Sequence, residues 1–164
     1  MLKDLIQQDF KEAFKNQEKV KLSVLKMLRA EITKKQQEKR YQLKKEHQEL
    51  EGEELEKQSI LTNEEILSVI ISKIKRSKES VAGFEQGGRA ELAEQEKEEI
   101  KILQKYLPEQ LSEEDIRSIV EEVVAKVGAE GMKDIGRVMS ELSPKVKGKA
   151  DGDLVIKIVR DILS

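Results

Sequence analysis

The sequence has no cysteine and a single histidine, His47, among its 164 residues. Without cysteine, the chain has no disulfide framework, no thiolate nucleophile and no thiolate metal site. The lone histidine removes most imidazole chemistry, and its neighbours in KKEHQEL are typical of a solvated helix surface. We therefore expect no catalytic residues, no metal site and no cofactor.

Aromatic residues are also scarce, at 3% of the chain, and there are only two prolines. Sheets favour aromatic and β-branched residues, whereas this chain is 39% charged and rich in Glu, Lys and Leu. That composition is typical of long solvated helices. It predicts an all-α fold, in which the 37% of apolar residues build modest cores.

Long hydrophobic runs are absent as well. No stretch approaches the roughly 20 apolar residues that cross a bilayer. The N-terminal segment MLKDLIQQDFKEAF has helical amphipathicity and carries acids, unlike a signal peptide. We expect a cytoplasmic protein with no membrane partner.

Apolar residues recur at helical spacing from the N-terminus onward. They predict a first helix with an apolar stripe from Leu2 to Ala13, an interruption at Asn16–Gln17 and a second helix from about Glu18. Large apolar residues then become rare. We therefore expect residues 33–59 to protrude into water or to fray, and their composition is compatible with a long helical arm that breaks at Gly52.

A capping signal marks the next helix. Thr62-Asn63-Glu64-Glu65 has the Thr-x-x-Glu spacing of a capping box and predicts a helix that ends at Gly87–Gly88. A fourth helix should begin at Arg89, with Leu92 among its buried residues, and end at Pro108.

The pattern restarts after Pro108, where Ser112-Glu113-Glu114-Asp115 provides a second cap signal. We therefore place a domain boundary there. The sequence predicts an N-terminal helical domain over residues 1–108 and a tail domain over residues 109–164.

Three short helices are predicted in the tail domain. The first ends at Gly128, a residue suited to a C-cap, and the second covers residues 132–142 and is stopped by Ser143-Pro144. The third begins near Asp151, whose carboxylate can cap it. Together they predict a three-helix bundle.

The net charge of −2 conceals an uneven distribution. Residues 15–45 hold eleven Lys and Arg against three Glu, and an acidic run over residues 46–56 follows. The tail domain has nine basic and twelve acidic residues, yet residues 133–149 hold five cations and two acids. Such a local excess can attract an anionic partner.

This basic segment lies in a glycine-punctuated stretch from Gly131 to Gly152, which we interpret as a hinge. Lys133 and Arg137 are spaced i and i+4 and share the face opposite the apolar residues of the expected helix. Three more lysines follow around Gly148: Lys145, Lys147 and Lys149. Two interpretations remain open, a phosphate-binding corner or a surface turn whose lysines confer solubility.

Two segments, KYLPEQLSEEDI and MKDIGRVMSELSPKVKGKADGDL, carry a family resemblance. The chain resembles the YqeY family, whose C-terminal part is similar to the tail domain of the B subunit of the tRNA-dependent amidotransferase. The resemblance covers nearly the whole chain, although residues 41–59 look longer and more acidic than the family pattern. It implies a helical N-terminal domain joined to a small helical tail that helps to hold tRNA.

The resemblance also implies tRNA contacts at the basic and glycine positions of the second segment. Those positions are Lys133, Arg137, Lys145, Lys147, Gly148 and Lys149. The family label of a carbon–nitrogen ligase that uses glutamine as amido-N-donor does not suit this chain alone. It has neither the Gly/Ser-rich amidase signature nor a glycine loop for ATP.

Three functions therefore remain open. The chain is expected to act as an accessory protein that binds tRNA or other RNA, as a non-catalytic accessory subunit of an amidotransferase, or as a protein-interaction module that uses the arm over residues 33–59. We expect no DNA partner.

Overall fold

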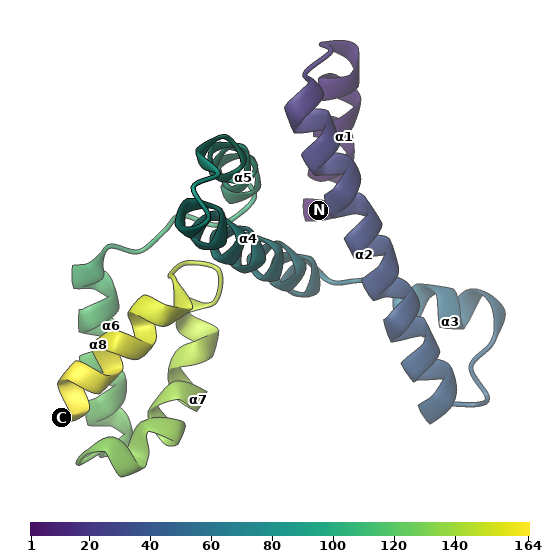
Figure 1. Cartoon of the computed structure of the whole chain (residues 1–164). Helices are drawn as coiled ribbons and strands as arrows, with labels where there is room; N and C mark the ends of the chain where they lie inside the picture. Colours follow the sequence, from purple (N-terminus) through teal and green to yellow (C-terminus); the bar gives the residue numbers. More distant parts are fainter. The chain divides into compact units, whose positions relative to one another are not determined.

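A computed structural model describes all 164 residues and confirms the predicted all-α fold (Figure 1). It contains eight α-helices, a short 3₁₀ helix η1 (Met132–Asp134) and no strand. No helix combines the length and the apolar character that crossing a bilayer requires. The α-helices are α1 (Leu2–Lys15), α2 (Lys19–Glu46), α3 (Gly52–Ser59), α4 (Asn63–Gln86), α5 (Ala90–Gln104), α6 (Glu113–Val127), α7 (Ile135–Val146) and α8 (Gly152–Leu163).

The chain divides into two compact units, Met1–Tyr106 and Leu107–Ser164. The first contains α1 to α5 and the second contains α6 to α8. Each unit has its own buried apolar residues, so each is described by itself.

The first unit is built from two helical hairpins, α1–α2 and α4–α5, which pack against each other. The first hairpin turns at Gln17, which adopts a left-handed φ of 56°, and the second turns at Gly88, with a φ of 67°. Both turns lie where the sequence predicts them. The fully buried side chains that join the hairpins include Ile6, Leu25, Leu28, Ile66, Ile70 and Leu103.

Two polar contacts fix α5 against its neighbours. The buried Tyr106 hydroxyl, just beyond α5, donates a hydrogen bond of 2.5 Å to Asp9 of α1. Burial and the hydrogen bond to Asp9 raise the pKa of Tyr106. Lys73 of α4 lies 3.9 Å from Glu99 of α5, and burial raises the pKa of the Glu99 carboxyl.

The prediction of a protruding arm over residues 33–59 is partly wrong. Helix α2 has no buried residue after Ile32, as expected, but α3 folds back on α2 and buries Leu55 and Ser59. The helical break covers residues 47–51, and Gly52 begins α3 with a φ of 55°. Residues 52–59 therefore do not protrude freely, because burial of Leu55 favours packing on α2.

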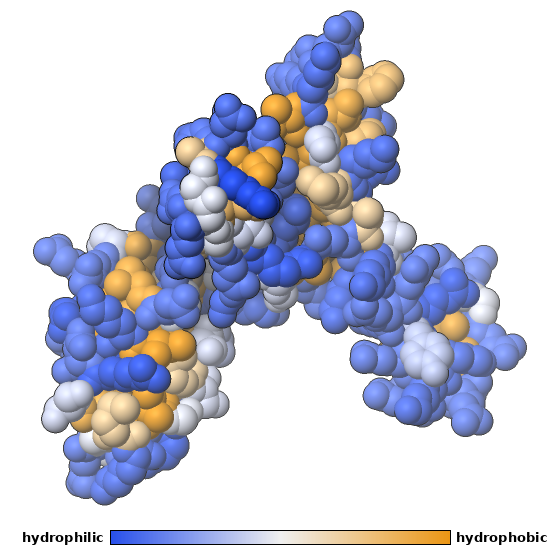
Figure 2. All heavy atoms as spheres, viewed as in Figure 1, coloured by the Kyte–Doolittle hydropathy of each residue, from blue (hydrophilic) through white to orange (hydrophobic).

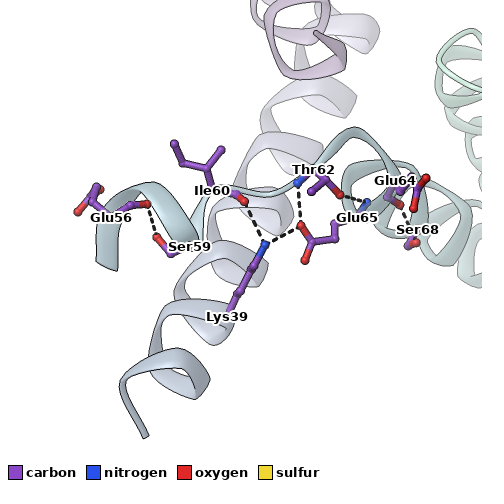
Figure 3. A network of polar contacts seen from close by, with 8 residues as sticks. All are labelled: Lys39, Glu56, Ser59, Ile60, Thr62, Glu64, Glu65 and Ser68. Atoms are coloured by element: carbon purple, nitrogen blue, oxygen red, sulfur yellow. Dashed lines mark hydrogen bonds and ion pairs between the residues drawn. The ribbon is translucent and has the colours of Figure 1, made fainter. Parts of the chain in front are cut away.

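One lysine joins the arm to the start of α4 (Figure 3). The ammonium of Lys39 donates to the Ile60 carbonyl at 3.1 Å and to the Glu65 carboxylate at 2.9 Å. Glu65 also forms the predicted capping box with Thr62. Burial acts to raise the pKa of Glu65, but hydrogen bonds from Lys39 and the Thr62 backbone outweigh it and lower the net pKa.

The tail unit is the predicted bundle of three helices around one apolar core. Its capping box at Ser112 and Asp115, the left-handed Gly128 after α6 and the Asp151 cap of α8 are all confirmed. The core is made by buried residues of all three helices: Ile116, Val120, Val123, Val138, Leu142, Val146, Val155, Ile158, Val159 and Leu163.

Three local predictions are wrong. Helix α7 passes through Pro144 and ends at Val146, which is buried in the tail core, so the extra turn gains apolar burial. Helix α5 ends at Gln104, ahead of Pro108. Leu92 is 38% exposed because the neighbouring Ala93 takes the buried position.

Truncating the fully buried Leu142 to alanine should destabilise the tail unit by about 2–5 kcal/mol, because the change removes apolar contacts and leaves a cavity. Hydrogen exchange measured on the full chain should show lost amide protection in α6 to α8 and retained protection in α4 and α5. The exposed Met132→Ala serves as the control and should change neither. Retained protection of the tail amides in the Leu142 variant would contradict this packing.

Candidate nucleic-acid interface

The six residues expected to contact tRNA all lie in the tail unit, between η1 and the loop after α7. Residues 147–150 are called the tail loop below. The five cations are exposed, as predicted, whereas Gly148 is buried. The stretch from Gly131 to Gly152, predicted to be a hinge, is mostly helix α7.

Two of the lysines form ion pairs within the tail. Lys133 lies 3.5 Å from Glu130, and both side chains are largely exposed. Lys145 of α7 lies 3.0 Å from Glu122 of α6, across the helix interface. These acids neutralise part of the positive charge that the sequence shows in this segment.

Arg137 is held by hydrogen bonds within the tail unit. Its guanidinium donates to the Val127 carbonyl at 2.6 Å and to the Asp134 carboxylate at 3.3 Å. Val127 is the last residue of α6, so Arg137 satisfies a carbonyl that the helix end leaves without an internal partner. The arginine thus joins α7 to the end of α6.

Lys147 and Lys149 are the two predicted contacts that keep an unneutralised charge. Both side chains are exposed, and neither makes an ion pair or a side-chain hydrogen bond. They stand two residues apart on either side of Gly148. Of the five cations in this segment, only Lys147 and Lys149 therefore have ammonium groups without a partner.

The backbone of the tail loop is held in place by residues 107–111, called the linker below. Gly148 has a left-handed φ of 77°, a conformation that other L-residues adopt at a cost. Its carbonyl accepts a hydrogen bond of 2.7 Å from the Gln110 amide, which also donates to Pro108. The Leu111 N–H donates to the Lys149 carbonyl, again at 2.7 Å.

Bonds from α7 hold the loop on its other side. The N–H groups of Lys149 and Ala150 both donate to the carbonyl of Val146, at 2.9 and 3.1 Å. Because Val146 is buried in the tail core, the loop is anchored to the packed part of the unit. Lys147 and Lys149 therefore extend from a fixed backbone into solvent.

Sequence reasoning missed the role of Gln110. The residue lies 38 positions before Gly148, and no local motif indicates that its side chain reaches the loop. The role of Gly148 also differs from a direct contact, since its buried backbone provides the turn between the two lysines. Only the basic and glycine character of the segment could be read from the sequence.

Comparison with known proteins identifies the family. The sequence pattern of the family described as Yqey-like protein matches residues 35–163. The chain belongs to the YqeY-like family. The match includes the tail unit except for Ser164 and therefore both free lysines, whereas most of the α1–α2 hairpin precedes it.

A curated relative of this YqeY-like chain is "Altered inheritance of mitochondria protein 41, mitochondrial" from Pyrenophora tritici-repentis (strain Pt-1C-BFP). The two sequences are 26% identical over 161 residues, which cover 96% of this chain and 78% of the relative. The relative's name places that protein in mitochondria. The cytoplasmic location expected for this chain stays a prediction.

Replacing Gln110 with alanine should loosen the tail loop, because the Gly148 carbonyl loses its side-chain donor. Amide hydrogen exchange should accelerate at Leu111, Lys149 and Ala150, whose N–H groups bond within the anchored region. The adjacent, exposed Glu109→Ala is the matched control and should leave these rates unchanged. Equal rates in the two variants would show that the Gln110 side chain does not hold the loop.

Proposed function

We propose that this chain is a non-catalytic accessory protein that binds RNA, with tRNA as the expected form, through Lys147 and Lys149. The observation that carries the proposal is the pair of exposed, unpaired ammonium groups on an anchored loop. The resemblance of the tail to the tRNA-holding domain of the amidotransferase B subunit supports the same ligand.

Lysine chemistry limits what this pair recognises. An ammonium group is a compact point charge that binds phosphate without reading base edges. Each phosphate that a lysine neutralises releases counterions, so the affinity falls as salt rises. The tail loop should therefore contribute affinity and position the RNA, with little preference for sequence.

The three neutralised cations have a secondary role in this proposal. Lys133 and Lys145 take part in exposed ion pairs, which contribute only about 0–1 kcal/mol each. Their acids compete with phosphate for the ammonium groups, so each should contribute less to RNA binding than Lys147 or Lys149. Arg137 is less available, because it also donates to the Val127 carbonyl.

The same geometry suits a protein that supports an amidotransferase. In that role the tail would hold the tRNA while a partner enzyme performs the glutamine-dependent chemistry. The family likeness of the tail supports this role as well. Association with such an enzyme is a second proposal, and it depends on RNA binding by the tail.

The double variant Lys147→Glu/Lys149→Glu should weaken tRNA binding by at least about tenfold at low salt. It should also reduce the slope of log K against log salt by about 2, one for each lost phosphate contact. Fluorescence anisotropy with labelled tRNA across a salt series measures both quantities.

The matched control is Lys97→Glu/Lys126→Glu, which alters the net charge equally. Both of these lysines are neutralised by acids, at 2.8 Å to Glu85 and 2.7 Å to Glu141. This control should retain most of the affinity and the original slope. If both double variants weaken binding alike, net charge rather than the tail loop governs the interaction, and the proposal is wrong.

A further inference from the structure

The α1–α2 hairpin ends in a turn that exposes an aromatic ring. Phe14, in the last turn of α1, is 70% exposed. The turn is closed by hydrogen bonds from Gln17 N–H to the Phe14 carbonyl at 3.3 Å and from Glu18 N–H to the Ala13 carbonyl at 3.0 Å. The ring is therefore displayed by an ordered turn, and Figure 2 shows hydrophobic surface beside hydrophilic atoms on this hairpin.

The preceding aromatic of α1 behaves differently. Phe10 is partly buried, and the guanidinium of Arg29 lies 4.3 Å from its ring centroid. Phe10 thus contributes to packing between α1 and α2. Phe14 has no such partner, so packing within the hairpin does not account for it.

Three free cations lie near Phe14 along the chain. Lys11 lies one helical turn before Phe14, Lys15 follows it directly and Lys19 begins α2 across the turn. All three are exposed, and none makes an ion pair or a side-chain hydrogen bond. Residues 11–20, called the hairpin tip below, therefore combine an unpartnered ring with three unpaired cations and one acid without an ion pair, Glu12.

We propose that the hairpin tip binds single-stranded RNA, with a base stacked on Phe14 and phosphates neutralised by Lys11, Lys15 and Lys19. Aromatic stacking combined with backbone neutralisation is the common chemistry of single-strand binding. One ring between lysines matches one base and its flanking phosphates. A lipid surface or an amphipathic acidic helix would require a continuous apolar stripe, whereas the tip itself exposes only Phe14 and Val20, and the other exposed apolar residues of the hairpin, Met1, Leu5 and Met27, lie outside it.

This site goes beyond the proposed function in place and in chemistry. The tip precedes the residues that match the family, which begin at residue 35. It shares with the tail loop only the class of ligand, because the tail loop has no aromatic ring. Each site can therefore fail its test while the other passes.

Tyr41 provides a matched control within the first unit. Its ring is 73% exposed on α2, about as much as that of Phe14. Two of the cations beside it are neutralised, with Arg40 3.6 Å from Glu56 and Lys44 3.0 Å from Glu51, and only Lys45, one helical turn further on, has no ion pair. An exposed ring with a single free cation beside it should bind RNA much more weakly than the hairpin tip.

The chain has no tryptophan, so a single introduced indole reports on its own surroundings. The probe is an oligouridylate of about 12 nucleotides, within the range that single-strand sites cover. Adding it to Phe14→Trp should quench the tryptophan emission by stacking, and rising salt should reverse the effect. Adding it to Tyr41→Trp should leave the emission unchanged.

Affinity measurements separate stacking from general apolar contact. Phe14→Leu keeps an apolar side chain but removes the ring, and should weaken oligouridylate binding by about tenfold. Phe14→Tyr keeps the ring and should retain the affinity. Lys11→Glu/Lys15→Glu should weaken binding and lower the salt slope by about 2.

Several results would overturn the site. Absence of quenching in Phe14→Trp, or equal quenching in Tyr41→Trp, excludes stacking at the tip. A blue shift with anionic phosphatidylserine vesicles and no response to RNA would assign the tip to a lipid surface instead. The quenching should persist when Lys147→Glu/Lys149→Glu is added, and its loss there would show that the tip is not a separate site.

Discussion

The candidate interface depends on the hydrogen bonds between the linker and the tail loop. Gly148 must adopt a left-handed backbone while buried, and the Gln110 side chain satisfies its carbonyl at 2.7 Å. A buried carbonyl without a donor would cost about 1–3 kcal/mol, comparable to a large share of the stability of so small a unit. Because these bonds fix the backbone, the lysines on either side of Gly148 point into solvent from an ordered segment.

Charge pairing decides which cations are available in this chain. With 39% charged residues, positive segments are frequent in the sequence, but part of their charge meets acids in the folded chain, as at Lys133 and Lys145. Lys145 is neutralised by Glu122, 23 residues earlier, whereas Lys147 has no such partner. The proposed RNA contacts therefore combine the absence of an acid with a second feature, which is the anchored backbone at the tail loop and the exposed ring at the hairpin tip.

The parts of the fold that depend on local chemistry could be predicted from the sequence. The caps at Thr62, Ser112 and Asp151 are examples, because a side chain and a backbone donor three residues apart settle each of them. The passage of α7 through Pro144 could not be predicted, because it depends on burial of Val146 against other helices.

The candidate site could likewise be predicted only in part from the sequence. Its basic and glycine character is visible in the sequence, and so is the family resemblance that indicates tRNA. The partners of each cation and the reach of Gln110 are tertiary facts, since they join residues up to 38 positions apart. The exposure of Phe14 was equally hidden, because helical spacing alone does not show which apolar side chains another helix covers.

Lysine acylation footprinting on the full chain, with and without tRNA, tests the central claim most directly, because it reads each ammonium group separately. Binding through the tail loop predicts that tRNA lowers acylation at Lys147 and Lys149 while leaving Lys126, which is paired with Glu141, unchanged. Equal acylation of Lys147 and Lys149 with and without bound tRNA would contradict the account.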